Sequence, residues 1–283
     1  MPEDRTDRRH RMQDRDHSDH TDRIGERDLT AWPTRAGQAT VRATMRAVDR
    51  SRGWVDERSI PVVVLLATAL IGVLVASVFV VLSAEIYDNV AEREGVSGFD
   101  RPVLDWVVQH RTDTWDTVVA HYTDLGGTVL MPVIAAVLAV ALALWWRRWT
   151  PILLMAVAAG GSLTLTIVGK QAIGRARPPH ELAVPPYETS PSFPSGHTLN
   201  SWVILLLAAY LVCCKVDERR WRVTAVVTAV VLAVAMGLSR VYLGHHWLTD
   251  VLVGWTLGSA WLVVVVTAHR LALTVARREP GGP

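Results

Sequence analysis

The sequence predicts an all-α, polytopic membrane protein, a bundle of six transmembrane helices that follows a charged tail. Hydrophobic residues make up 50% of the 283-residue chain, the formal net charge is only +2, and the apolar residues gather in six nearly uncharged runs. Each run is roughly 17 to 24 residues long, enough at about 1.5 Å per residue to cross a hydrocarbon core about 30 Å thick as a helix. The expected helices cover residues 60–83, 127–146, 151–169, 197–214, 222–238 and 247–268.

Residues 1–59 differ in composition from the rest of the chain. Arg and Asp alternate there with His, Thr and Gln, and apolar residues are too few to build a core. We expect a disordered, solvated tail in front of a membrane domain at 60–278. A patch that binds anionic lipid headgroups is the alternative, but the acids nearly cancel the arginines. The balanced charge of the whole chain gives no indication of a nucleic-acid partner.

The basic residues of the short loops predict the orientation, because Lys and Arg accumulate on the cytoplasmic side of a membrane. They fall between helices two and three, between helices four and five, and after helix six: Arg147, Arg148, Lys215, Arg219, Arg220, Arg222, Arg270, Arg277 and Arg278. We therefore expect both termini to be cytoplasmic. The connections 84–126, 170–196 and 239–246 then lie on the outer side.

The first outer connection contains two short pieces with an apolar face. Both have helical spacing and predict amphipathic helices at the outer interface, either as a rim over a site or as a structural cap. Their apolar residues are Val103, Leu104, Val107 and Val108, then Trp115, Val118, Val119 and Tyr122.

Two cations follow the third apolar run. Lys170 ends that run, and Arg177 is seven residues further on, which places both on one face if the helix continues. Pro178 and Pro179 then stop the helix. Such a pair could clamp an anion, and the alternative is that both side chains extend to lipid phosphates.

The fourth apolar run opens with Pro194-Ser195-Gly196-His197. Ser195 and Gly196 suit the cap and turn before a first helical turn. Free N–H groups at a helix start, with the positive end of the helix dipole, form a cradle for phosphate. His197 would stand beside it.

The third outer connection combines Ser239 and Arg240 with a histidine and an aspartate. His246 and Asp250 are four residues apart, a spacing that on a helix lets the carboxylate hold one ring nitrogen and leave the other free as a nucleophile. A purely structural hydrogen bond and a zinc site are the alternatives, although zinc would need a third ligand among neighbours that are mostly cations. We expect the adjacent His245 to point away from the pair, at the membrane surface.

These three motifs together resemble the signature of the type 2 phosphatidic acid phosphatase superfamily. The pattern is K-x6-R-P, P-S-G-H and S-R-x5-H-x3-D, and residues 170–178, 194–197 and 239–250 match it without a departure. The resemblance covers residues 84–268. It implies a membrane lipid phosphate phosphatase with six membrane helices and a metal-independent, cofactor-free site on the extracytoplasmic face of the cell membrane.

The resemblance also implies roles for single residues. His246 attacks phosphorus to form a phosphohistidine, Asp250 orients it, and His197 protonates the leaving oxygen and then activates water. The residues implied to bind phosphate are Lys170, Arg177, Ser195, Gly196 and Arg240.

The implied substrate is a lipid-linked phosphate or diphosphate, such as a polyprenyl diphosphate, phosphatidic acid or phosphatidylglycerol phosphate. The alternatives are a phosphotransferase that passes the phosphoryl group to a lipid or sugar hydroxyl, a vanadate-dependent haloperoxidase, whose relatives are soluble, and a non-catalytic lipid-binding membrane protein. We expect the loop 178–194, with Tyr187 and Glu188, to shape substrate choice, and Arg175 and His180 to be solvated. The sequence predicts neither the particular lipid nor an oligomeric state.

Overall fold

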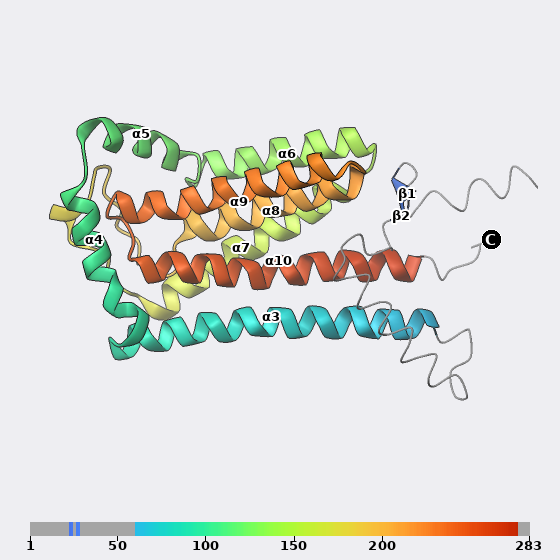
Figure 1. Cartoon of the computed structure of the whole chain (residues 1–283), viewed down its shortest axis with the longest axis horizontal. Helices are drawn as coiled ribbons and strands as arrows, with labels where there is room; N and C mark the ends of the chain where they lie inside the picture. The colour runs from blue at the N-terminus through green and yellow to red at the C-terminus, as the bar shows by residue number, and fades with distance from the viewer. Residues whose placement is uncertain (1–22, 25–26, 29–59, 277–283) are drawn as a thin grey trace, which may run out of the picture. The chain divides into compact units, whose positions relative to one another are not determined.

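The computed structural model describes residues 23–24, 27–28 and 60–276. Six long helices, labelled as in Figure 1, lie where six were expected: α3 (Ile60–Glu92), α6 (Leu130–Trp146), α7 (Thr150–Ile173), α8 (Gly196–Lys215), α9 (Arg219–Tyr242) and α10 (Leu248–Ala276). The connections hold α4 (Asp100–Gln109), α5 (Asp113–Asp124) and the 3-10 turns η2 (Gly95–Phe99) and η3 (His180–Leu182). A small hairpin pairs β1 (Arg23–Ile24) with β2 (Arg27–Asp28) in antiparallel fashion. The rest of the tail lies outside the described residues, and its disorder stays a prediction.

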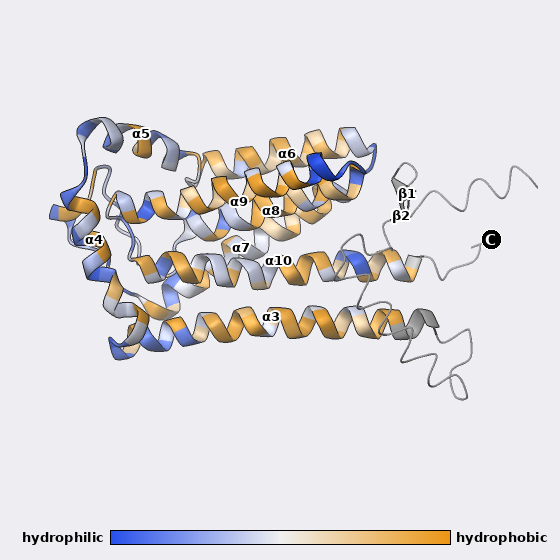
Figure 2. Ribbon diagram, viewed as in Figure 1, coloured by the Kyte–Doolittle hydropathy of each residue, from blue (hydrophilic) through white to orange (hydrophobic). Residues whose placement is uncertain are grey.

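The prediction of an all-α membrane protein is confirmed. Five of the described helices are long and apolar enough to cross a membrane, and α6, with 17 residues, is about 25 Å long, at the lower end of the range for a span. Large apolar side chains of α6 and α7, among them Val133, Leu144 and Leu153, are exposed, as expected for surfaces that face lipid. Figure 2 shows apolar residues along these helices and hydrophilic residues around α4.

Two of the helices, α3 and α10, extend furthest beyond the apolar runs that predicted them. α3 continues past residue 83 to Glu92, after which Arg93 takes a left-handed φ of 61°. α10 begins at Leu248 and continues past residue 268 to Ala276. Hydropathy marks the part of a helix that lies in hydrocarbon, whereas the helix itself ends where the backbone leaves helical geometry.

The chain divides into two compact units. Val73–Val266 forms the larger unit, with α4 to α9 and most of α3 and α10. The smaller unit comprises the residues before and after that range, of which the structure describes the hairpin, the first turns of α3 and the last turns of α10. All contacts considered below lie within the larger unit.

α8 forms the core of the larger unit and packs against α6, α7 and α9. Leu199, Val203, Leu207 and Leu211 recur every fourth residue along α8, and none of them has any exposed surface. α10 also approaches α8 closely, because a Cβ atom at Gly254 would lie 2.9 Å from the side chain of Thr198 on α8. The buried stripe of α8 therefore fixes the positions of the helices that carry the sequence motifs.

α4 and α5 form a cap at the end of the larger unit where α7 ends and α8 and α10 begin (Figure 1). α4 is amphipathic as expected, since Leu104 is 1% exposed, whereas Trp115, on the expected apolar face of α5, is 61% exposed. Arg111, between the two helices, donates to the carbonyl oxygens of Tyr242 at 2.7 Å and Leu182 at 2.6 Å. The cap is thereby tied to the loop that follows α7 and to the last residue of α9.

Substitution of two glycines with left-handed backbones can test how closely the loops after α7 and α9 pack. Gly174 and Gly244 have φ of 61° and 70°, and a Cβ atom would meet nothing within 4 Å at Gly174 but the Leu182 carbonyl oxygen at 2.5 Å at Gly244. We expect Gly174→Ala to cost about 1–2 kcal/mol through its backbone alone, and Gly244→Ala to cost more because of the clash. Thermal unfolding of both variants in one detergent measures the difference, and equal shifts in Tm would contradict the close approach.

Candidate active site

Side chains from the ends of α7, α9 and the starts of α8 and α10 meet beneath the cap. His246 and Asp250 occupy the centre of this group and are 1% and 0% exposed. The Nδ1 atom of His246 lies 3.2 Å from Oδ2 of Asp250. His246 precedes α10 and is not part of it, so the contact does not come from two positions on one helix face. Asp250, in the first turn of α10, instead turns back to accept the N–H of Trp247 at 3.0 Å, as in half of a capping box.

The contacts of His246 define which ring nitrogen is free. Nη1 of Arg177 lies 3.2 Å from Nε2, and because a guanidinium has only donors, Nε2 must accept and the proton belongs on Nδ1, facing Asp250. Burial, and after it the charges of Arg177 and Arg240, lower the pKa of His246 well below its usual value. The ring is therefore neutral near pH 7, with a lone pair on Nε2.

A carboxylate joins the cations beside Nε2. Glu188 lies 2.7 Å from Nη2 of Arg177 and also pairs with Arg240, whose side chain is 2% exposed. Burial alone would raise the pKa of Glu188, but Arg240 and Arg177 together lower it to about 2. Its negative charge thus occupies the space between the two arginines expected to hold phosphate.

Arg177 reaches Lys170 by a different path from the one predicted. α7 ends at Ile173 and Gly174 has a left-handed backbone, so the helix does not continue to Arg177. The loop returns instead, and Ser190 Oγ lies 3.3 Å from Nζ of Lys170 and 3.1 Å from Nη2 of Arg177. The two cations are brought together by the loop, and Gly174 was the sequence signal for the break.

The Pro194–His197 motif forms the start of α8, as expected, with Ser195 as its N-cap residue. The Ser195 side chain has no exposed surface and accepts a hydrogen bond from Oγ1 of Thr198 at 2.9 Å, while its N–H donates to the Asp250 carbonyl oxygen at 3.2 Å. Ser195 therefore ties α8 to α10. Gly196 and His197 line the cavity that also contacts His246.

Two residues differ from expectation, and a third makes a contact that the sequence did not predict. His245 is not at the surface but 5% exposed, and its Nε2 donates to the Val184 carbonyl oxygen at 2.7 Å. Burial and Arg240 lower the pKa of His245 to about 4. Arg175 is not solvated but pairs with Asp250 at 2.5 Å. Ser192, which sequence analysis did not single out, donates to Asp250 Oδ2. These partners could not be found from motif spacing, since they come from separate segments.

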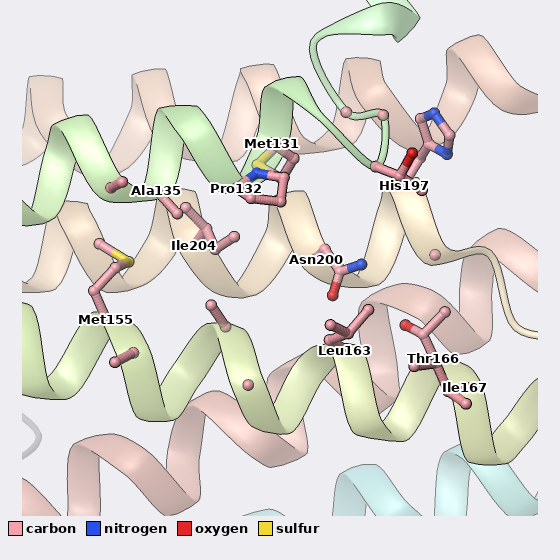
Figure 3. Close-up of a pocket in the computed structure, with 18 of the residues that line it drawn as sticks. Met131, Pro132, Ala135, Met155, Leu163, Thr166, Ile167, His197, Asn200 and Ile204 are labelled. Carbon is pink, nitrogen blue, oxygen red and sulfur yellow. The ribbon is translucent and has the colours of Figure 1, made fainter.

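A cavity of about 630 Å³ extends from this group along the interior of α6, α7 and α8. Figure 3 shows His197 and Asn200 at one end of the cavity and Met131, Ala135 and Met155 further along it. Small and apolar residues line most of it, and several of them, including Leu163 and Ile167, are exposed. The cavity is therefore open at the exposed surface of the helix bundle.

The described residues contain no group of three or more His, Cys, Asp or Glu side chains placed to hold a metal ion. They do contain a neutral histidine held by a carboxylate, beside three cations and an apolar cavity. Phosphoryl transfer requires mainly positioning and positive charge around the phosphate oxygens. Fold and site together define a polytopic membrane phosphatase.

Comparison with known proteins agrees with this class. A family model described as the PAP2 superfamily matches residues 149–273. Phosphatidylglycerophosphatase B of Bacillus subtilis is 30% identical over 181 residues, which cover 64% of this chain and 85% of the relative. The chain belongs to the PAP2 superfamily and is a lipid phosphatase.

The chain is also similar to a solved structure and, over a shorter segment, to a second relative. The crystal structure of a transmembrane PAP2-type phosphatidylglycerolphosphate phosphatase from Bacillus subtilis aligns with a TM-score of 0.61 and 29% identity, covering 70% of this chain and 95% of that one. An undecaprenyl-diphosphatase of Sulfolobus acidocaldarius is 36% identical over 77 residues, which cover 27% of this chain and 32% of the relative.

The position of Glu188 leads to a prediction about anion binding. Because its pKa is about 2, the carboxylate keeps its charge above about pH 4 and competes with any anion for the two arginines. We expect Glu188→Gln to tighten the binding of inorganic phosphate by about tenfold at low salt. Titration of phosphate against the Tm of the purified variant measures this affinity.

Glu181→Gln is the matched control, because Glu181 lies in the same loop and is exposed. Its phosphate affinity should equal that of the unsubstituted protein. Unchanged or weaker binding by the Glu188 variant would mean that the carboxylate does not compete for the anion position.

Proposed function

We propose that this lipid phosphatase hydrolyses a phosphate monoester or diphosphate at the extracytoplasmic face of the cell membrane, without a metal ion, through a phosphohistidine on His246. One observation carries the proposal: His246 has Asp250 at Nδ1 and Arg177 at Nε2, within 3.2 Å on both sides. The unprotonated nitrogen therefore faces the cations that would hold the phosphate.

In the first step, Nε2 of His246 bonds to phosphorus while the bond from phosphorus to the lipid oxygen breaks. His197, at the start of α8, gives a proton to the departing oxygen, or to the departing phosphate if the substrate is a diphosphate. Lys170, Arg177 and Arg240 neutralise the phosphoryl oxygens, with the N–H of Gly196 and the buried Ser195 completing the cradle.

In the second step, water attacks phosphorus, gives its proton to His197, and the bond from phosphorus to Nε2 breaks. Inorganic phosphate leaves and the imidazole returns to its neutral form. Division of the hydrolysis into two transfers lowers each barrier. Glu188 has to leave its position between Arg177 and Arg240 before either step, because the phosphate occupies the same space.

The cavity supports a lipid as the substrate. It begins at His197 and His246 and continues past Leu163 to Met155, so a phosphate at the histidines would place a lipid tail among apolar side chains. Asn200 provides a polar exception one turn from His197, and its Oδ1 atom is buried without a hydrogen-bond partner, available to a hydroxyl group next to the phosphate. The matched relatives' names specify phosphatidylglycerophosphate and undecaprenyl diphosphate, and both remain candidate substrates here with phosphatidic acid.

The distribution of charge supports a site on the outer face of the membrane. The loops opposite the site carry most of the basic residues of the membrane domain, and such loops are cytoplasmic. Both termini then lie in the cytoplasm. A cysteine introduced at exposed Glu181 tests the orientation, because a membrane-impermeant reagent should label it in intact cells. Labelling only after lysis would mean that the site faces the cytoplasm.

The role of His246 gives the most direct test of the proposal. We expect His246→Ala to abolish phosphate release from detergent-dispersed lipid phosphates in the presence of a chelator, since no other group supplies the attacking nitrogen. His245→Gln is the matched control, because its amide can still donate to Val184 and turnover should largely remain. Mass spectrometry of the products separates release of phosphate from its transfer to another hydroxyl. Equal turnover by the His246 variant would exclude the phosphohistidine.

The cavity gives an independent prediction. A Cβ atom at Gly160 would meet nothing within 4 Å, and the residue lines the cavity, so Gly160→Phe should fill part of it without disturbing the bundle. We expect kcat/KM for long-chain lipid phosphates to fall by about tenfold or more, with turnover of a short, water-soluble phosphate ester unchanged. Val157→Phe is the control, because Val157 lies on the same helix, is 46% exposed, and does not line the cavity. Equal effects of the two variants on the lipid would contradict a tail site here.

A further inference from the structure

A row of three charged side chains lies behind the nucleophile. Asp250 pairs with Arg175 at 2.5 Å, and Arg175 pairs with Asp100 at 2.7 Å. Neither Arg175 nor Asp100 is a fixed position of the three sequence motifs, and Asp100 also lies outside the segment that the family model matches. The row connects the nucleophile's carboxylate to the first residue of α4 in the cap.

Asp100 acts at the start of α10 as a capping residue supplied by another helix. Its Oδ1 accepts the N–H of Thr249 at 2.9 Å and its Oδ2 accepts the Thr249 hydroxyl at 2.7 Å. The first N–H groups of a helix lack partners within it, and the positive end of the dipole favours a carboxylate there. Asp100 is 5% exposed and Thr249 has no exposed surface, so water does not compete for these bonds.

Arg175 fixes the two carboxylates relative to each other. Its Nη1 donates to Oδ1 of Asp250 and to Oγ1 of Thr249, at 2.5 and 2.8 Å, while its Nη2 donates to Asp100. A planar guanidinium imposes a direction on each of these bonds. With Oδ1 of Asp250 held by Arg175, the other oxygen, Oδ2, is the one that faces Nδ1 of His246.

The charges around His246 make the row important for the reaction. Asp250 contacts Nδ1 and Arg177 contacts Nε2, while Arg240, Lys170 and Glu188 also act on the ring. Transfer of a phosphoryl group makes the imidazole positive beside three cations. A pair made of Asp250 and Arg175 alone would be neutral, whereas the row with Asp100 keeps one negative charge behind the ring.

We propose that Arg175 and Asp100 are positioning residues of the nucleophile: Arg175 orients the Asp250 carboxylate, and Asp100 restores the negative charge that Arg175 would otherwise cancel. The proposal rests on the phosphohistidine mechanism proposed above. The row contributes both the direction of the hydrogen bond to His246 and the electrostatic stabilisation of the positively charged ring.

Two substitutions of opposite charge test this role. Asp100→Asn keeps the acceptor for Thr249 but removes a negative charge, and Arg175→Gln removes a positive one. Both should lower kcat for a lipid phosphate by about ten- to a hundredfold, as for other groups that orient an active-site ligand, and leave KM nearly unchanged.

The acid limb of the pH profile of kcat should distinguish an electrostatic role of the row from a purely structural one. Loss of the negative charge lowers the pKa of His246 further, so Asp100→Asn should move the limb to lower pH. Loss of the positive charge raises the pKa of His246, so Arg175→Gln should move the acid limb to higher pH. We expect each of the two shifts to be about half a pH unit. The double variant should return toward the original limb, and Asp100→Glu, which keeps the charge, should stay near it.

Arg111→Gln is the control, because it removes contacts of the cap without contacting Asp250 or His246. It should lower Tm and leave the pH profile in place. Shifts of the limb in the same direction for Asp100→Asn and Arg175→Gln, or no shift while Tm falls, would overturn the proposal and leave the row as a docking contact only. If Asp100→Asn does not fold, the proposal is decided by whether Arg175→Gln alone moves the acid limb to higher pH. Failure of the mechanism itself would be visible separately, as phosphate release by His246→Ala.

Discussion

The arrangement of the site depends on the burial of one carboxylate, Asp250, at the start of a membrane helix. A charged group in that position is costly unless all its hydrogen-bonding capacity is used, and removal of one partner from such a pair costs about 3–5 kcal/mol. Its side chain meets Arg175, Ser192, His246 and the N–H of Trp247, while its carbonyl oxygen accepts the N–H of Ser195. The loop after α7, the start of α8 and the turn before α10 are thus assembled around a single residue.

Two sets of charges with opposite signs surround the imidazole of His246. In front of it, Glu188 lies between Arg177 and Arg240, which gives a positive set with Lys170 nearby. Behind it, Arg175 lies between Asp250 and Asp100, which gives a negative set. This polarity favours a negative phosphoryl group on the front face and a positive ring behind it. Each set also contains its own counter-charge, which reduces the repulsion between like charges at low dielectric.

The sequence was sufficient for the fold class and for a choice of motif residues that the structure brings together, because both depend on local signals: apolar runs of membrane length, and fixed spacings at their ends. It was insufficient where the partner comes from a distant segment. Asp100 precedes Arg175 by 75 residues, and no periodicity relates the two. The same holds for His245, for which adjacency to His246 indicated a surface position although Val184 holds it inside. Gly174, which ends α7, was visible in the sequence but was outweighed by the seven-residue spacing of the cations.

The tethered carboxylate of Glu188 has a consequence for a site that faces a bilayer. Anionic phospholipids present phosphodiester groups in great excess, each with a single negative charge, which brings no more charge to Arg177 and Arg240 than the carboxylate already supplies. A terminal phosphate monoester carries between one and two charges near pH 7 and a diphosphate carries more. In the proposed mechanism, displacement of Glu188 would impose a charge threshold that bulk lipid does not meet. The ordinary membrane surface would then be a weak competitor for the three cations.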